Sequence, residues 1–326
     1  MDRRQFVIGS AAAAAAWSLE AVAQEAFPAR PVTIVNAFPP GGANDLVTRP
    51  IASALEPVFK QPFLVETKAG AAGAVGAQFA ASAKPDGYTI LSHNNGLAGY
   101  ADVDKLFGRP PKVTRADFIP LARLAADPVL LVVSAQTPWK TLEEFVADAK
   151  KRPGQIVYSS GGLYGASHLP VAMLEDTAKL PKMRHLPTAG GGPAVTAVLG
   201  NNAQASTQTV LATLQHIKGG KMRALACFGA ERSKALPDVP TMKERGYDIV
   251  YYLWVGLFAP KGTPAAIVST LAGGIDKAAA SPMFSGAIAK IGLEPTYLGA
   301  AAFTKFWEAD ADRSAEAVRS IGKVAG

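Results

Sequence analysis

The sequence predicts an α/β protein of two lobes, in which each lobe is a mainly parallel sheet flanked by helices. One observation is length, because 326 residues are enough for two domains at roughly 100 to 200 residues each. Another is that short apolar segments alternate with helical patterns along the chain, as in parallel sheets with crossover helices. A hydrophobic fraction of 49% with 18% charged residues excludes wholesale disorder.

The first 23 residues have the pattern of an export signal. Arg3 and Arg4 precede an apolar stretch at residues 11–17, and residues 21–23 read Ala-Val-Ala, which fits the signal-peptidase pattern. The paired arginines resemble a twin-arginine signal, with an ordinary secretory signal as the alternative. The apolar stretch is too short to span a bilayer, and no later segment offers 18 uncharged apolar residues. We therefore predict a soluble periplasmic protein whose mature chain begins at Gln24.

The first lobe is predicted to contain residues 26–128 and 250–326. The apolar runs at 119–124 and 129–133 are expected to carry the chain from one lobe to the other. Thr263-Pro264 and Ser281-Pro282 each place a hydroxyl before a proline, which predicts two capped helices that close the chain. The other elements expected here are strands at 31–37, 63–66, 88–92 and 254–259 and helices at 46–59 and 78–83.

The second lobe is predicted to contain residues 129–249. Thr141 and Glu144 form a capping box for a helix that ends near Lys151. A glycine-rich loop, residues 190–192, lies between a strand and a helix, as does Gly41-Gly42 in the first lobe. The remaining elements expected here are strands at 155–159, 184–187 and 224–228 and helices after residue 168 and at 193–199.

The two glycine-rich loops are candidate anion sites. Each places free backbone N–H groups and the positive end of a helix dipole at the carboxyl edge of a strand, where α/β sheets bind ligands. One such loop in each lobe predicts an anion held in a cleft between the lobes. The alternative is that both turns are glycine-rich only because strand and helix pack closely there. Asp45, in a first helical turn, is either a dipole-favoured cap or a residue that orients water or ligand.

Catalytic and cofactor motifs are missing from the sequence. It contains no G-x-S-x-G nucleophile motif and no phosphate-binding P-loop, and Gly70, Gly73 and Gly76 have the wrong spacing for a dinucleotide site. Cys227 lies in an apolar strand pattern, which favours a buried inert thiol. We predict no enzyme activity, no cofactor and no metal. The histidines lack metal-binding spacing and are expected to be hydrogen-bonded structural or cleft residues, namely His93, His168, His185 and His216.

The charge of the chain is positive but dispersed. The formal net charge is +7, yet no run of Lys and Arg is longer than residues 150–152. A nucleic-acid partner is therefore not expected.

Several segments resemble one protein family. Residues 38–45, Phe-Pro-Pro-Gly-Gly-Ala-Asn-Asp, followed by Arg49, resemble the first-loop motif of the Bug or TctC family, the periplasmic receptors of tripartite tricarboxylate transporters. Further matching segments follow in the family's order over nearly the whole mature chain, at residues 84–89, 159–169, 191–200, 236–241 and 256–264.

The resemblance implies a periplasmic-binding-protein (Venus-flytrap) fold that closes over a small carboxylate and delivers it to a membrane permease of the tripartite tricarboxylate type. It implies a monomer without cofactor. Two alternatives remain open: a sensory receptor of the same fold, and an exported α/β hydrolase. Ligand contacts are expected at Phe38, Pro40, Gly41, Gly42, Asn44, Asp45, Ser160, Gly161, His168, Thr188, Gly190, Gly191, Ser206 and Thr207.

The sequence departs from the family pattern where ligand choice would be set. Ala37 replaces a usual proline, Thr188-Ala189 replace an aromatic and a basic residue, and Gln204 stands where Asp is common. Thr67-Lys68-Ala69 replace Asn-Arg-Pro. These departures leave the identity of the carboxylate unassigned.

Overall fold

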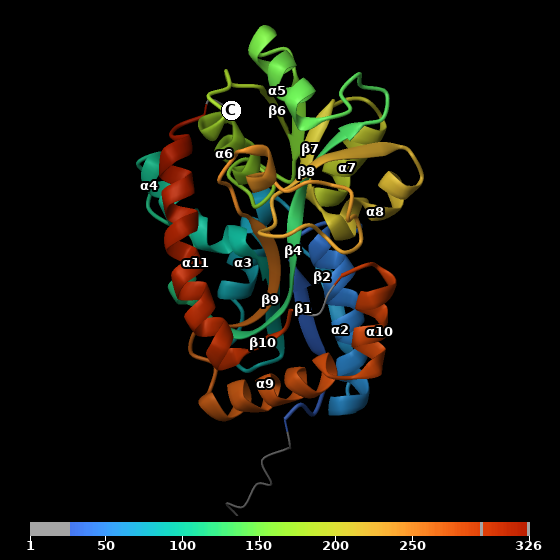
Figure 1. The fold of residues 1–326 in the computed structure, drawn as a ribbon. Helices are drawn as coiled ribbons and strands as arrows, with labels where there is room; N and C mark the ends of the chain where they lie inside the picture. Colours follow the sequence, from blue (N-terminus) through green and yellow to red (C-terminus); the bar gives the residue numbers. More distant parts are fainter. Residues whose placement is uncertain (1–26, 294–295, 325–326) are drawn as a thin grey trace, which may run out of the picture.

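The structure of the protein is a computed structural model, which describes residues 27–293 and 296–324. The predicted signal peptide, residues 1–23, lies outside the described residues. A ten-stranded sheet runs through the whole molecule in the order β2-β1-β3-β9-β4-β7-β5-β6, with β8 and β10 paired to β4. Helices cover both faces of this sheet (Figure 1).

The first lobe is built around three parallel strands joined by helices. β1 lies between β2 and β3, and its side chains pack between the helices that cover the two faces. This arrangement confirms the alternation expected from the sequence. The elements are β1 (Val32–Asn36), α2 (Ala43–Phe59), β2 (Phe63–Thr67), η2 (Ala71–Gly73), α3 (Ala74–Ala81), β3 (Thr89–Asn94), η3 (Asn95–Gly99), α4 (Tyr100–Leu106) and η4 (Arg115–Asp117).

The second lobe repeats the plan. β5 pairs in parallel with both β6 and β7. The predicted capping box is present, since Thr141 Oγ1 accepts from Glu144 N and the Glu144 carboxylate accepts from Thr141 N, each over 3.3 Å. The elements are α5 (Leu142–Lys151), β5 (Val157–Ser160), α6 (Leu169–Thr177), β6 (Arg184–Pro187), α7 (Gly191–Leu199), β7 (Ala205–Thr209), α8 (Val210–Lys218), β8 (Met222–Cys227) and η5 (Lys243–Arg245).

One strand joins the two lobes. The runs predicted as separate connectors are a single strand, β4 (Phe118–Ser134), because β9 (Tyr252–Pro260) pairs antiparallel with the residues between them. Pro128 does not break the strand because it lies where β4 changes partner from β9 to β7 and β8. A proline lacks the N–H that a continuous ladder would need, so a change of partner is a tolerated position.

In the described part of the chain three helices follow β9, where the sequence predicted two. Ser281 caps α10 as expected, accepting from Phe284 N, but Thr263 donates to the Pro260 carbonyl and caps nothing. The missed helix, α11, begins after an uncapped glycine and so lacks a start signal. It extends along one side of the molecule towards α6 (Figure 1). The elements are α9 (Ala265–Ala279), α10 (Pro282–Lys290), β10 (Leu298–Gly299) and α11 (Ala300–Ile321).

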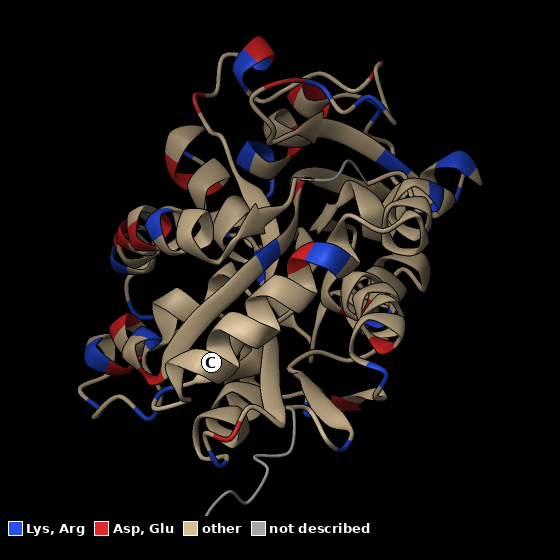
Figure 2. Ribbon diagram, turned by 90° about the horizontal axis from the view of Figure 1, so that it is seen from below, with Lys and Arg blue, Asp and Glu red and all other residues tan. Residues whose placement is uncertain are grey.

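The outer surface carries charges of both signs. On the face shown in Figure 2, Lys and Arg alternate with Asp and Glu over the outer helices and loops. Within residues 27–293 and 296–324, no helix is both long and apolar enough to cross a membrane.

Candidate functional site

Two helix N-termini meet between the lobes without side-chain caps. α2 starts after Gly42 and α7 starts after Gly190, and neither N-cap residue makes a side-chain hydrogen bond to its helix. The first-turn N–H groups of a helix have no intrahelical acceptor, and they carry the positive end of its dipole. The two glycine-rich loops found in the sequence therefore bring the positive ends of two helices to the same region between the lobes.

The two glycine loops touch one another. A Cβ atom on Gly190 would lie 2.5 Å from Cδ of Pro39, and one on Gly42 would lie 3.3 Å from the backbone nitrogen of Gly192. Residues with side chains would hold these backbones apart. Gly41 also has a φ of +82°, a conformation that L-residues rarely adopt. The glycines thus permit the direct contact between lobes that closes the space behind the loops.

Behind this contact lies a cavity of about 30 Å³. It has room for one small polar group. The lining residues that the structure describes include none with a charged side chain, so their polar groups are hydroxyls, amides and backbone. The lining is Phe38, Gly42, Ala43, Asn44, Asn94, Gly161, Gly165, Ala166, Ser167, Gly191, Gln208, Thr209 and Leu253.

The structure brings five of the sequence-predicted site residues to this cavity and places the others around it. The predicted residues that line the cavity are Phe38, Gly42, Asn44, Gly161 and Gly191. Those that lie outside its lining are Pro40, Gly41, Asp45, Ser160, His168, Thr188, Gly190, Ser206 and Thr207.

Asp45 shapes the first loop from behind. Its carboxylate accepts from Gly41 N over 3.3 Å, from Asn36 Nδ2 over 3.4 Å and from Arg49 Nε over 2.8 Å. The Asp45 side chain is 7% exposed, whereas that of Arg49 is 52% exposed. Asp45 therefore ties the glycine turn to its own helix and to β1.

The predicted hydroxyl groups of the second lobe hold backbone rather than face the cavity. Ser206 Oγ donates to the Ser159 carbonyl over 2.7 Å, and Thr207 Oγ1 donates to the Ser167 carbonyl. Thr188 Oγ1 lies 2.9 Å from the Ser160 carbonyl and 2.8 Å from that of Gly190. These bonds fix the relative positions of the strand ends around the cavity.

Two stacked histidine rings and a serine that hydrogen-bonds one of them form a group that was not predicted from the sequence. Ser160 Oγ lies 2.7 Å from His185 Nε2, and the His185 ring stacks on that of His168 with centroids 4.4 Å apart. Burial lowers the pKa of His185 to about 4. Burial, with smaller effects of His185 and Lys182, lowers the pKa of His168 to about 3. Both rings are neutral at pH 7. Ser160 and His168 are buried, whereas His185 is half-buried.

Four lining residues with an amide or hydroxyl side chain were not predicted from the sequence, namely Asn94, Ser167, Gln208 and Thr209. Gln208 Nε2 donates to Ser206 Oγ over 3.0 Å, and Ser167 Oγ accepts from Gly161 N over 2.7 Å. Asn94 could have been found, because it ends β3, a parallel strand whose carboxyl end faces the ligand edge of the sheet. Gln208 gave no such signal because β7, whose segment Ala-Ser-Thr-Gln-Thr is polar, was not predicted as a strand.

Strained backbone borders the site. Ala71, Ala72 and Tyr164 have positive φ values of 46°, 55° and 56°, which cost non-glycine residues free energy. A Cβ atom on Gly162 would lie 2.6 Å from that of Ala72, so the lobes also touch here. Strained residues of this kind cluster at ligand sites, where the surrounding structure holds them.

A larger cleft lies on the other side of that contact. Its volume is about 600 Å³, and residues of both lobes line it. Thr188 and Ala189, two of the departures from the family pattern, line this cleft together with Tyr100, Arg109 and Lys112.

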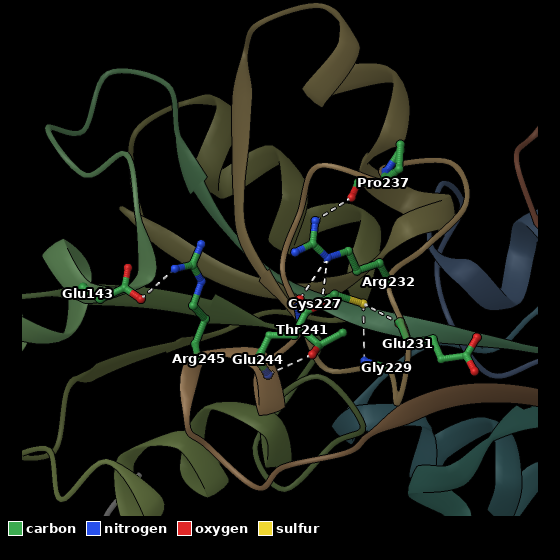
Figure 3. A network of polar contacts seen from close by, with 9 residues as sticks. All are labelled: Glu143, Cys227, Gly229, Glu231, Arg232, Pro237, Thr241, Glu244 and Arg245. Atoms are coloured by element: carbon green, nitrogen blue, oxygen red, sulfur yellow. Dashed lines mark hydrogen bonds and ion pairs between the residues drawn. The ribbon is translucent and has the colours of Figure 1, made fainter.

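His93 and Cys227 are held by hydrogen bonds within the fold. His93 Nε2 lies 2.8 Å from the Tyr100 hydroxyl, and burial lowers the pKa of His93 to about 4. His216 lies in the last turn of α8. Cys227 is buried at the end of β8, where its Sγ accepts from Gly229 N over 3.3 Å and burial raises the pKa of its thiol (Figure 3). The contacts of His93 and Cys227 agree with the structural roles predicted for these two residues.

Arg232 and Glu244 brace the loop that follows Cys227. Arg232 Nε lies 2.9 Å from Glu244 Oε2, which also accepts from Thr241 N over 2.8 Å (Figure 3).

Within residues 27–293 and 296–324, no group of three or more histidine, cysteine or acidic side chains is placed to hold a metal ion.

Comparison with known proteins supports the resemblance. Residues 47–323 match the model of the tripartite tricarboxylate transporter family receptor, TctC. Protein BugT of Bordetella pertussis is 33% identical over 276 residues, which are 84% of each chain. The chain thus matches this relative over most of its length.

Two solved structures share the fold. The periplasmic binding protein BugD is 30% identical, with a TM-score of 0.83 over 91% of this chain and 99% of that one. MatC from Rhodopseudomonas palustris, solved with bound malate, is 27% identical, with a TM-score of 0.82 over 89% of this chain and 99% of that one. These matches confirm the two-lobed fold of periplasmic binding proteins. The chain belongs to the family of tripartite tricarboxylate transporter receptors, TctC.

Proposed function

We propose that the protein captures a small carboxylate between its lobes in the periplasm and delivers it to a membrane permease of the tripartite tricarboxylate type. The observation that carries this proposal is that two uncapped helix N-termini, those of α2 and α7, meet at one small cavity lined by neutral polar groups. Helix N-termini favour anions, and a carboxylate is small enough to contact both.

The cavity has a neutral lining and two positive helix ends, which favours one carboxylate group as its occupant. A carboxylate that leaves water needs several hydrogen-bond donors in return. Backbone N–H groups at the two helix ends and the Gln208 amide supply donors without adding a buried arginine. The malate bound by the related MatC supports a small carboxylate as the ligand class.

The proposed site keeps the predicted residues in two roles. Gly42, Gly161, Gly191, Phe38 and Asn44 contact the carboxylate. The others position the loops, namely Pro40, Gly41, Asp45, Ser160, His168, Thr188, Gly190, Ser206 and Thr207. We propose that the first lobe comprises residues 26–128 and 250–326 and that the second lobe comprises residues 129–249. We propose that the protein binds its ligand without turnover, as expected for a receptor of this family.

A thermal-shift screen of small mono-, di- and tricarboxylates tests the ligand class, followed by calorimetric titration of each hit. A ligand at 100 times its Kd stabilises the protein by about 2.7 kcal/mol. Gly42→Val is expected to abolish binding, since a side chain there meets the opposite loop. Gly273→Ala is the control, because no atom lies within 4 Å of a Cβ at that position. Unaltered affinity in Gly42→Val would remove the first loop from the site.

Export and delivery need separate measurements. N-terminal sequencing of protein from the periplasm is expected to give Gln24 as the first residue. Uptake of the labelled carboxylate into membrane vesicles that contain the permease should depend on added receptor. Uptake that proceeds equally without the receptor would contradict the transport role.

A further inference from the structure

A further cavity lies between α6, β6 and the end of α11. Its volume is about 390 Å³, within the range of roughly 300 to 1,000 Å³ that small-molecule pockets occupy. The lining residues that the structure describes include none that line the cavity behind the glycine loops. The two cavities are therefore separate sites.

A buried histidine presents an N–H donor to this cavity. His168 is 2% exposed and lines the cavity, and its Nδ1 accepts from Tyr164 N over 2.9 Å. Because a backbone N–H always donates, Nδ1 carries no proton, so the neutral ring holds its proton on Nε2. A flipped ring would set a carbon atom against the Tyr164 N–H, so this bond also fixes the orientation of the ring.

The Nε2 donor has no partner and can be reached from the cavity. Within residues 27–293 and 296–324, no group accepts a hydrogen bond from His168 Nε2. The buried side-chain atoms of these residues that lack both a partner and contact with open space are Asn95 Oδ1 and Trp307 Nε1. His168 Nε2 is not one of them, so it borders the cavity that His168 lines. An unpaired buried donor costs free energy, which a ligand with an acceptor atom would recover.

The charges in the wall of this cavity are unbalanced. Lys182, Arg184 and Lys323 are cationic, and Glu175 is the only carboxylate among the lining residues that the structure describes. The Glu175 carboxylate is already bound, since it accepts from Lys182 Nζ over 3.0 Å and from Met183 N over 2.8 Å. Among the described residues, no acidic side chain pairs with Arg184 or Lys323. Two positive charges are therefore left for an anionic ligand to neutralise.

Lys323 is held at this wall by the residues on either side of it. The Tyr164 hydroxyl donates to the Gly322 carbonyl and accepts from Val324 N, each over 2.8 Å. These bonds fix the segment after α11 against the part of the chain that leads into α6, and Figure 1 shows the end of α11 beside α6. A segment that is ordered in advance lowers the entropy cost of placing its cation beside a ligand.

The rest of the wall is largely apolar. Leu163, Ala172 and Met183 line the cavity, as do Ile321 and Val324 from the end of the chain. A bare inorganic ion would leave this surface uncovered. The cavity therefore favours an anion that carries an organic group.

We propose that this cavity is a second binding site, which takes an organic phosphate monoester. Arg184 and Lys323 pair with the phosphate, and His168 Nε2 donates to one of its oxygens. The organic group packs against Leu163 and Met183. Three donor groups and two unbalanced positive charges match the three terminal oxygens and the charge of roughly −1.5 to −2 that a phosphate monoester carries at pH 7. The site is independent of the carboxylate cavity and of its proposed role.

Phenyl phosphate and phenyl sulfate test this assignment as a matched pair. Both have a phenyl group and a tetrahedral head with three terminal oxygens, but at pH 8 the phosphate carries about two negative charges and the sulfate one. In calorimetric titrations of the exported protein, phenyl phosphate is expected to bind at least tenfold more tightly than phenyl sulfate, which is about 1.4 kcal/mol. Inorganic phosphate should also bind at least tenfold more weakly than phenyl phosphate. Equal affinities within either pair, or no detectable binding of phenyl phosphate at millimolar concentration, would overturn the proposal.

Two charge variants locate the binding. Arg184→Gln and Lys323→Gln are each expected to weaken phenyl phosphate binding at least tenfold. Lys151→Gln is the matched control, because it removes the same charge at an exposed position at the end of α5 and should change nothing. Carboxylate affinity should keep its wild-type value in all three variants. Phenyl phosphate affinities that are equal in the control and in the two wall variants would contradict the proposal.

A third variant tests the histidine donor. His168→Asn removes the Nε2–H group and leaves an amide oxygen that can still accept from Tyr164 N, and it is expected to weaken phenyl phosphate binding at least tenfold. Gly42→Val, in the other cavity, should leave phenyl phosphate binding unchanged. Unchanged binding in His168→Asn, lost binding in Gly42→Val, or crystallographic density for phenyl phosphate elsewhere would overturn the assignment. If His168→Asn does not fold, the Arg184 and Lys323 variants and the ligand pair still decide.

Discussion

A Cβ atom on Gly192 would lie 2.4 Å from the carbonyl oxygen of Pro40, across the boundary between the lobes. Gly192 belongs to the first turn of α7 and Pro40 to the loop before α2. A contact this close requires backbone against backbone. The φ of Gly192 is not positive, so its own backbone conformation does not require a glycine. The close approach of Pro40 from the opposite lobe does.

Gly192→Ala is expected to hold the lobes apart. The methyl group blocks the approach to Pro40, while alanine is at least as good as glycine in a helix. Carboxylate affinity should fall at least tenfold without loss of stability in the unliganded protein, as measured by calorimetry and by thermal unfolding. Gly273→Ala, in an open helical position, should leave affinity unchanged. Equal affinity in both variants would refute this role of the contact.

Asp45→Asn is expected to weaken carboxylate binding about tenfold. Three donors point at the Asp45 carboxylate, from Gly41, Asn36 and Arg49, and an amide has a single acceptor oxygen. The loop must then shift or leave donors unpaired, at a cost of about 1 to 3 kcal/mol. Arg49→Gln removes only a partly exposed ion pair, worth about 0 to 1 kcal/mol. Calorimetric titration measures the carboxylate affinity of the Asp45→Asn and Arg49→Gln variants, and urea unfolding measures their stability. Equal affinities of the two variants would show that Asp45 does not position the loop.

Gln208→Leu is expected to reduce affinity at least tenfold with a smaller effect on stability. The change removes an amide from the cavity wall and keeps a side chain of similar size. Gln215→Leu is the matched control, because Gln215 is exposed on α8. Calorimetric titration of both variants with one carboxylate makes the comparison. An unaffected Gln208→Leu would exclude this amide from the site.

Asp127→Asn is expected to change how stability depends on pH. Burial raises the pKa of Asp127 from 3.8 to about 7, although hydrogen bonds from Leu211 N and Thr209 oppose the shift. Between these values the folded protein binds a proton that the unfolded chain has lost, so this group's contribution to stability falls as pH rises from 4 to 7. The asparagine does not titrate. Relative to wild type, the variant should therefore gain roughly 2 to 4 kcal/mol over that window.

Urea unfolding at pH 4.5, 6 and 8 measures this difference. Asp238→Asn, at an exposed position, is the control and should follow the wild-type curve. A difference between Asp127→Asn and wild type that stays constant over the three pH values would contradict the raised pKa.

Local signals were enough where neighbouring residues along the chain decide the structure. The Thr141–Glu144 capping box and the Ser281 cap were predicted correctly, because each is a bond within one helical turn. α11 was missed for want of such a signal, although Phe303, Trp307 and Val318 are spaced to bury one helical face. β7 was missed because its polar residues are buried by pairing with β4 and β5, which no local pattern records.

The sequence by itself determined the alternation of strands and helices and the two glycine loops that start α2 and α7, because periodicity and turn chemistry are local properties. Only the tertiary structure decided which side chains reach the cavity. Asn94 and Gln208 line it, from strands 114 positions apart in the chain, while Ser206 and Thr207 bond to backbone instead. β4 pairs with β9 in the first lobe and with β7 in the second, so it sets how far the strands that carry Asn94 and Gln208 lie from each other in space. Which side chain faces the cavity depends on the register of each strand, and that register is fixed by partner strands far away in sequence.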